Sequence, residues 1–435
     1  MYSWEGPLMA AKPQLTTEQQ SSYRWVMAII AGILMTTSFV ALTSFGVASP
    51  AIAQSLHLNP ATVNTYGVDS FSIGLFLAFF LGHGGIFDTR VKTGVLVAQI
   101  LLIVPQFLLP ITTSLWLLTV LRFAQGLMIM MLALFSLQLS GWFRPSERGR
   151  SLAFTLGAIT LGGAVGGLLS SRLESLGWRE MYYITGLIMI VGAVIYFLFA
   201  RNAQSLQEML LKEKQQSTKH QSAWKLGITW MMGFVQIPLT WTLFSVGGFL
   251  PSYAYHLGYH TNQVGTLMFV WGIAGFVAAF VGAFLGDAMS AKHATHSGVF
   301  RARLKVMTAA NILMGLGALL VLMLGHASFG LLMFAVIVNA FMMMLPPNYW
   351  ATPGTIFPLA LIGAGAFGMG LISNSTSAIG PLVSSALVPT VGWNGVFIIM
   401  TVLSAIGVVL NVIAGRMPLP SEEQVVTPRS HSING

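Results

Sequence analysis

The stretch Ser114–Arg150 reads SLWLLTVLRFAQGLMIMMLALFSLQLSGWFRPSERGR. Its apolar part is long enough to cross a bilayer as a helix, which takes about 20 residues. Arg122 lies inside this apolar part, and a basic loop follows Trp142. An arginine in hydrocarbon is costly, so it usually has a partner and a function. The loop indicates the cytoplasmic side, because Lys and Arg gather there.

The composition of the whole chain predicts a membrane protein built only from helices. Charged residues make up 8% of the 435 residues, whereas soluble domains carry about 25%. Apolar runs of membrane-spanning length recur, and the segment 25–68 contains no Asp, Glu, Lys or Arg. The alternating segments of about ten residues that mark a membrane β-barrel are absent from the sequence.

Charge and cysteine content limit the partners and cofactors. The net charge of +9 resides in loops, where membrane orientation and anionic lipid explain it, so we expect contact with a lipid bilayer and none with nucleic acid. With no cysteine in the chain, disulfides, thiolate chemistry and cysteine metal sites are excluded. The histidine pairs His256/His260 and His293/His296 lack further ligands, and no phosphate-binding loop is present. We therefore expect no metal and no cofactor.

Twelve candidate spans can be read from the apolar runs. They cover 25–48, 62–86, 94–112, 116–141, 151–172, 180–200, 226–250, 263–286, 303–325, 328–348, 359–387 and 395–415. With both termini in the cytoplasm, nearly all Lys and Arg fall on the cytoplasmic side, and only Arg172 and Arg179 fall outside. A shift by one span would scramble this pattern, so an even number of spans is favoured.

One long polar segment divides the spans into six and six, and this sets the predicted domains. We expect a cytoplasmic N-terminal segment (1–24) that is not a cleavable signal, a six-helix bundle (25–200), a cytoplasmic linker (201–225), a second six-helix bundle (226–415) and a disordered cytoplasmic tail (416–435). The linker is most simply a solvated amphipathic helix, with a regulatory binding role as the alternative.

Two turns occupy corresponding positions in the two halves. Asp88, Arg90 and Lys92 follow the second span, and Asp287 and Lys292 follow the eighth. Such internal symmetry is typical of transporters built from repeats. Gly84, Asp88 and Lys92 match part of the loop motif G-x-L-A-D-R-x-G-R-R of the major facilitator superfamily. Arg122, Gln125 and Gly126 match its R-x-x-Q-G motif.

The resemblance to the major facilitator superfamily covers nearly the whole chain, and two segments resemble its organic anion:cation symporters. These are WFRPSERGR and the region YWATPGTIFPLALIGAGAFGMGLISNSTSAIGPLVSS. The resemblance implies two pseudo-symmetric six-helix bundles that rock around a central cavity. It also implies a conformational latch at the cytoplasmic helix ends, for which the matching residues are Asp88, Arg90, Lys92, Asp287, Glu147 and Arg148. The alternative for Asp88 and Arg90 is that they only cap and orient the turn.

Asp69 and Arg122 are the ionisable residues well inside the spans, and they lie at similar depth. A lone charge at that depth is costly and a pair is tolerated. We therefore hypothesise that they pair in one state, and that protonation of Asp69 or binding of an anion at Arg122 separates them. A static structural ion pair is the alternative.

Arg122 is also the candidate clamp for an anionic substrate, because guanidinium binds carboxylates bidentately. No second cation lies inside the spans, which argues against a dianion. The remaining substrate-binding candidates are polar or aromatic residues of spans that would line the cavity, although a buried amide is often only an interhelical contact. They are Gln125, Thr36, Thr43, Gln236, Trp241, Asn339 and Asn374.

The leading hypothesis is proton-coupled transport of a small organic anion, such as a monocarboxylate, by alternating access. The alternative is a proton-driven efflux antiporter for a drug or metabolite. The glycine-rich fifth span resembles an antiporter motif but lacks its proline. A membrane receptor on the same fold is a third hypothesis, disfavoured by the short loops. No nucleophile–base pair supports an enzyme. We expect a monomer in the cell inner membrane whose partners are a small-molecule substrate and protons.

Overall fold

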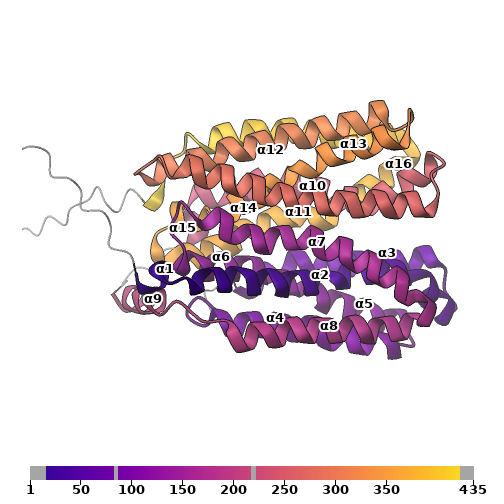
Figure 1. Cartoon of the computed structure of the whole chain (residues 1–435), viewed down its shortest axis with the longest axis horizontal. Coiled ribbons are helices and arrows are strands. Elements are labelled where there is room, and N and C mark those ends of the chain that lie inside the picture. Colours follow the sequence, from indigo (N-terminus) through magenta and orange to yellow (C-terminus); the bar gives the residue numbers. More distant parts are fainter. Residues whose placement is uncertain (1–15, 83–86, 217–221, 422–435) are drawn as a thin grey trace, which may run out of the picture.

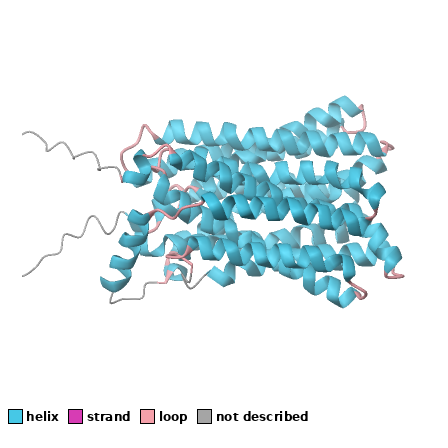
Figure 2. Cartoon of the chain, turned by 60° about the horizontal axis from the view of Figure 1, so that its bottom comes forward, coloured by secondary structure: helices cyan, strands magenta, loops and turns pink. Residues whose placement is uncertain are grey.

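The computed structural model describes residues 16–82, 87–216 and 222–421, and within these ranges every regular element is a helix (Figure 2). Gly84 of the second-span turn, and residues 217–221 and 422–435, lie outside the described residues. Nine stretches of the described part are long and apolar enough to cross a membrane, and a shorter apolar one covers Thr65–Leu81.

The helices of the first half follow the six predicted spans in order. Their bounds are α2 Tyr23–Ser55, α3 Pro60–Gly82, α4 Val91–Leu108, α5 Leu115–Gly126 continued by η2 Leu127–Met130 and α6 Met131–Trp142, α7 Arg148–Leu173 and α8 Trp178–Phe199. Short elements flank them, namely α1 Thr17–Gln20, η1 Leu109–Ile111, η3 Glu174–Leu176 and α9 Gln204–Gln216.

The second half repeats this arrangement. Its bounds are η4 Ala223–Lys225, α10 Gly227–His256, α11 Thr261–Ser290, α12 His296–Leu324, α13 Phe329–Ala340 with η5 Phe341–Met344 and α14 Leu345–Trp350, then α15 Pro353–Ile356, η6 Leu359–Leu361 and α16 Ile362–Ala414. Gly392 interrupts α16 with a φ of 66°, which divides it into two helices. The predicted fold of twelve spans is thereby confirmed.

The two halves lie side by side, and α7, α11 and α14 fill the space between them (Figure 1). Small residues allow the close approach, as is usual between membrane helices. A Cβ on Gly162 of α7 would lie 2.5 Å from the carbonyl oxygen of Thr36 on α2. A Cβ on Gly272 of α11 would lie 2.6 Å from the Cβ of Ala164 on α7. The glycine-rich fifth span therefore packs closely against a helix of each half.

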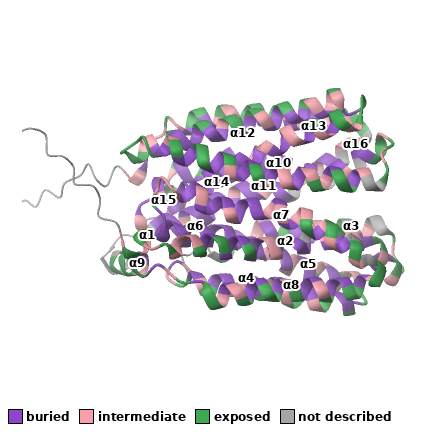
Figure 3. Ribbon diagram, viewed as in Figure 1, coloured by how far each residue is buried: buried purple, intermediate pink, exposed green. Residues whose placement is uncertain are grey.

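Burial follows this arrangement, with buried residues between the helices and exposed residues on the outer surface (Figure 3). Many of the exposed residues are large and apolar. Leu198 of α8 is 72% exposed and Met323 of α12 is 66% exposed. Soluble monomers rarely expose apolar side chains over a wide continuous surface. The outer surface is therefore suited to lipid.

One end of the bundle, here named the termini face, carries α1, α9, α15 and the last described residue, Ser421 (Figure 1). Helix α9 occupies the predicted linker and buries Leu206 and Leu210. The tail was expected to be disordered from residue 416, but Leu419 is only 2% exposed. Its apolar side chain joins the core cluster, so the described chain remains packed up to Ser421.

Candidate functional site

Asp287, at the last turn of α11, binds the first turn of α7 across the interface between the halves. Its carboxylate accepts hydrogen bonds from the backbone N–H groups of Gly149 (3.0 Å) and Arg150 (2.8 Å), and from Nε of Arg150 at 3.1 Å. A carboxylate is stabilised at a helix N-terminus by free N–H groups and by the helix dipole. Asp287 thus caps α7 and ties the two halves together at the termini face.

Arg303 of α12 completes this contact, although in the sequence it is only one of the many Lys and Arg residues near the ends of the spans. Its guanidinium is fully buried and pairs with Asp287 at 2.8 Å. It also donates to the backbone oxygen of Pro145 in the loop before α7 (2.5 Å) and to Oδ1 of Asn348 (3.2 Å). A buried arginine therefore bridges both halves through neutral and charged acceptors.

Asp88 occupies the corresponding position in the other half. It is 3% exposed, and a Cβ on Gly363 would overlap its Oδ1. Gly363 is the second residue of α16, so the carboxylate of the first half lies at a helix N-terminus of the second half. The internal symmetry suggested by the two turns thus has a structural counterpart: each half places an aspartate against the first turn of a helix in the other.

Three other predicted latch residues make their described contacts within the first half. Nζ of Lys92 donates to the carbonyl oxygens of Phe197 (2.7 Å) and Ala200 (3.1 Å), and so caps the C-terminus of α8. Glu147 pairs with Arg24 at 2.9 Å. Arg90 precedes α4 and is exposed. The contacts of Lys92 and Glu147 therefore join elements of the first half and not the two halves.

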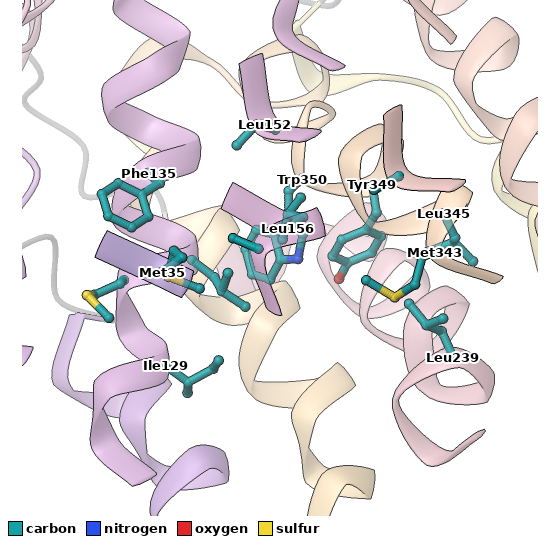
Figure 4. Close-up of a cluster of buried hydrophobic side chains, with 14 of the residues drawn as sticks. Met35, Ile129, Phe135, Leu152, Leu156, Leu239, Met343, Leu345, Tyr349 and Trp350 are labelled. Atoms are coloured by element: carbon teal, nitrogen blue, oxygen red, sulfur yellow. The ribbon is translucent and has the colours of Figure 1, made fainter. Parts of the chain in front are cut away.

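An apolar cluster built by both halves lies deeper than these polar contacts (Figure 4). Trp350 of α14 stacks on Phe79 of α3, with ring centroids 6.1 Å apart and planes 16° apart. Its carbonyl oxygen accepts a hydrogen bond from the buried hydroxyl of Ser136 on α6 at 2.6 Å. Trp350 is 1% exposed, so the halves meet here without a solvated gap.

Toward the opposite face the direct contact between α7 and α11 ends. A Cβ on Gly157 would lie 3.3 Å from Ala279, and the series of close approaches continues up to Ala164 and Gly272. Beyond that point, a Cβ on Gly167 of α7 or on Gly265 of α11 would meet no atom within 4 Å. The interface is therefore tight at the termini face and at the centre, and it loosens toward the opposite face.

Arg122 lies inside the first half, 1% exposed. Its guanidinium lies against the rings of Phe45 and Phe71, with Cζ 4.2 and 4.5 Å from their centroids. Nε donates to the carbonyl oxygen of Gly67 at 3.1 Å, and Nη1 donates to Oε1 of Gln125 at 2.8 Å. Nη2 has no hydrogen-bond partner in the described part of the chain. The cation is therefore held by aromatic faces and neutral acceptors.

Gln125 carries this network across the bundle. Its Nε2 donates to Oε1 of Gln106 on α4 (2.8 Å), and Nε2 of Gln106 donates to the hydroxyl of Thr185 on α8 (2.9 Å). A satisfied chain of buried amides stabilises one relative arrangement of its helices. In this state the motif residues Arg122 and Gln125 join α3, α5, α4 and α8.

Asp69 does not contact Arg122 in this structure. None of the three ion pairs within the described ranges includes it. Gly67 and Phe71 face Arg122, and Asp69, two positions after Gly67, points about 200° away around the helix axis. The two charges lie at a similar level along the helices, since Arg122 binds Gly67. Asp69, however, lies on a face of α3 that is turned away from Arg122. Asp69 is half-buried and shares its stripe with Ile73, which is 45% exposed.

The six other substrate-binding candidates differ in their surroundings. Gln236 and Trp241 of α10 each have a buried polar atom without a hydrogen-bond partner, Oε1 and Nε1 respectively. Asn374 of α16 donates within its own helix, to the carbonyl oxygen of Gly370 at 2.9 Å. Asn339 of α13 donates to Met314 of α12 at 3.1 Å, which is an interhelical contact.

Thr36 and Thr43 lie on the side of α2 that faces α7. Both are half-buried, and the backbone of Thr36 and the side chain of Thr43 approach Gly162 and Gly166. Trp271, which was not predicted from the sequence, also has a buried Nε1 without a hydrogen-bond partner among the described residues. Among the described residues, the second half therefore offers several unused neutral donors and no lysine or arginine at this depth. A buried donor without a partner needs an explanation, such as a binding site. It can be recognised only from the structure, because the sequence does not show which groups are paired.

Residues 25–301 match the family described as the Major Facilitator Superfamily. This chain belongs to the Major Facilitator Superfamily. It is a multi-pass membrane protein and a transporter of small molecules, not an enzyme. The fold is similar to the crystal structure of the human organic anion transporter MFSD10 (TETRAN), with a TM-score of 0.69, 15% sequence identity, and coverage of 90% of this chain and 100% of that chain. No curated protein matches the sequence.

Proposed function

We propose that this superfamily member transports a small organic anion, a monocarboxylate in the simplest case, together with a proton by alternating access. The observation that carries the proposal is the asymmetry of the interface. Asp287, Arg303 and Trp350 hold the halves together at the termini face and the centre, whereas Gly167 and Gly265 have no neighbour within 4 Å of a Cβ at the opposite face. Such a molecule is in one of the two end states that alternating access requires.

The termini face is the cytoplasmic side in this proposal. It carries most of the loop cations, including Arg144 and Lys292, as expected for a positively charged cytoplasmic side. Both termini then lie in the cytoplasm, the state described is closed toward it, and the membrane is the cell inner membrane. We propose that a single chain, a monomer, forms the whole pathway.

The charge of the substrate follows from the available cations. Arg122 is the only Lys or Arg in the middle of the described spans, and its Nη2 is unused. One guanidinium neutralises one carboxylate, while the indole N–H groups of Trp241 and Trp271, which have no partner among the described residues, suit neutral acceptor oxygens. The structural neighbour MFSD10 (TETRAN), a human organic anion transporter, supports this class. To reach Arg122, an anion has to displace the ring of Phe45 or Phe71.

The proton is assigned to Asp69, and the structure suggests how it would be coupled to the anion. Asp69 and the carbonyl oxygen that binds Arg122, that of Gly67, belong to the same turn of α3. A movement of α3 when Asp69 is protonated would therefore change the acceptors of Arg122, without any direct pair between the two charges. This coupling route does not require the direct ion pair that the sequence predicts for one of the two states.

The test is uptake into proteoliposomes under an imposed pH gradient, with a panel of radiolabelled monocarboxylates. Wild type is compared with Arg122→Ala, Asp69→Asn and the matched control Arg179→Ala, which removes an exposed arginine near the opposite face. We expect gradient-driven accumulation in wild type and the control, none in Arg122→Ala, and gradient-independent equilibration in Asp69→Asn.

Two outcomes would overturn the proposal. Full gradient-driven accumulation by Asp69→Asn would remove its coupling role. No accumulation of any acid, together with proton leak evoked by hydrophobic drugs, would favour the efflux antiporter.

A further inference from the structure

A cavity of about 250 Å³ lies at the termini face, between the two halves. Ser140 of α6, Arg148 of α7 and Met209 of α9 line it on one side. His296 of α12 and Gly354 of α15 line it on the other. Because both halves and the linker helix form its walls, the cavity exists only while the halves are together at this face.

Arg148 borders this cavity as a buried cation without an anion. It is 8% exposed, and its described acceptors are two backbone oxygens, those of Phe143 (3.3 Å from Nε) and Ser140 (3.2 Å from Nη2). Its Nη1 has no hydrogen-bond partner among the residues that the structure describes. None of the three ion pairs within the described ranges includes Arg148. Its neighbour Glu147 is paired with Arg24 instead.

Such an arrangement is unusual, because a buried charge is normally paired and its five N–H donors are normally satisfied. A Cβ on Gly354 would overlap Nη1, so only a glycine at this position of the cavity wall leaves room for the guanidinium. The carboxylate of Glu18, next to the cavity, is already bound by the N–H and hydroxyl of Ser205. The described walls therefore present a cation and polar groups but no free carboxylate.

We propose that this cavity binds a small anion, a carboxylate or a phosphate group, on the guanidinium of Arg148. The planar fork of arginine suits both groups. The site is separate from the transport pathway around Arg122, because it lies at the end of the closed interface that forms the termini face. A ligand that binds only when the halves are together stabilises that state by mass action. Cytoplasmic anion would therefore slow the opening of the protein toward the termini face.

The experiment measures the thermal unfolding of the purified full chain in neutral detergent. Three probes are added at constant ionic strength: inorganic phosphate, succinate, and phosphatidylglycerol in the micelles. The variants are Arg148→Gln and Met209→Trp, which fills the cavity from α9 outside the bundles and so keeps the test valid if Arg148→Gln folds poorly. Arg144→Gln, an exposed arginine of the same loop, is the matched control.

We expect at least one probe to raise the Tm of wild type and Arg144→Gln, with a rise that grows with the logarithm of its concentration. The apparent affinity should fall at least about tenfold in Arg148→Gln, because a charged hydrogen bond is lost, and also in Met209→Trp. A response to phosphate or succinate identifies a free anion, and a response to phosphatidylglycerol alone identifies a lipid headgroup.

Two results would overturn the proposal. One is that none of the three probes raises the Tm of the wild type, or that the rise is equally large in Arg148→Gln. The other concerns Glu422 and Glu423, which directly follow Ser421 in the sequence. If the probes act only on the double variant Glu422→Gln/Glu423→Gln, the protein's own tail occupies the site and the free-ligand proposal fails.

Discussion

Replacing Asp287 by asparagine should shift the protein from the state closed at the termini face toward the open one. Asp287 accepts two backbone hydrogen bonds and one from Nε of Arg150 across the interface. Its pair with Arg303 joins two helices of the same half, so that pair persists in both states and does not contribute to the difference. Only the contacts that cross the interface therefore determine the shift.

The size of this shift can be estimated from those contacts. Hydrogen bonds to a charged group contribute about 1.5–3 kcal/mol each, and a neutral one about 1 kcal/mol. The asparagine oxygen keeps neutral bonds to the N–H groups of Gly149 and Arg150 in part. At the lower end of these values a net loss of about 2 kcal/mol is expected, which is roughly a 30-fold change in the closed-to-open ratio.

Cysteine labelling measures this ratio, because the chain contains no cysteine of its own. Ala279→Cys reports on the closed part of the α7–α11 contact, and Gly167→Cys reports on the loose part. With Asp287→Asn, labelling by a small maleimide should accelerate at position 279, by up to about 30-fold, and slow at position 167. Glu208→Gln, an exposed acid on α9, is the control and should change neither rate.

Opposite changes at the two positions distinguish a change of state from a loss of structure. If both cysteines become more reactive, the variant has loosened and Asp287 is a stability residue. If neither rate changes in a folded variant, the N-terminal cap of α7 does not hold the interface, and the reasoning is refuted.

Two further predictions concern packing and pH. Gly162→Val should lower the Tm, because its Cβ would lie 2.5 Å from the immobile carbonyl oxygen of Thr36, an overpacking cost of about 1–3 kcal/mol; Gly167→Ala, with no atom within 4 Å, should leave the Tm unchanged. Burial raises the pKa of Glu18, but the hydrogen bonds that its carboxylate accepts, including those from the N–H and hydroxyl of Ser205, together lower the pKa by a larger amount. The net pKa therefore lies below its usual value. The α1–α9 contact should therefore be fully stabilised above the usual glutamate pKa and lost as the pH falls through the lowered one. Amide exchange in α9, referenced at each pH to Glu18→Gln, should show protection that disappears in acid; protection that is independent of pH would contradict this.

The fold was predictable because hydropathy and charge placement are both strong in this sequence. Each predicted span has a helix in the same order, and the cations gather at one face. The positions of Asp88 and Asp287 at helix ends were also predictable, because both turns follow a span at equivalent places. What the sequence could not provide is the helix start that each aspartate contacts, since that depends on how the two halves pack.

The surroundings of individual charges could not be predicted, for the same reason. Asp69 and Arg122 were predicted to lie at one depth, but depth does not give the face of the helix, and Asp69 lies two positions after the contact at Gly67. The motif predicts Lys92 as part of a latch, and in this state it binds carbonyl oxygens of α8. Arg303 looked like one more loop cation, and only the packing of α12 against Asp287 shows that it is buried.

The small-residue contact between α7 and α11 can move along the two helices without being lost. The engaged part runs from Gly149 and Asp287 to Ala164 and Gly272, and the surfaces just beyond it, at Gly167 and Gly265, are equally bare. Contacts released at one end can therefore be replaced by similar contacts at the other, without a side chain having to move out of the way. An interface of this kind keeps the two end states close in free energy. A modest gradient of substrate or protons then decides which of the two states is populated.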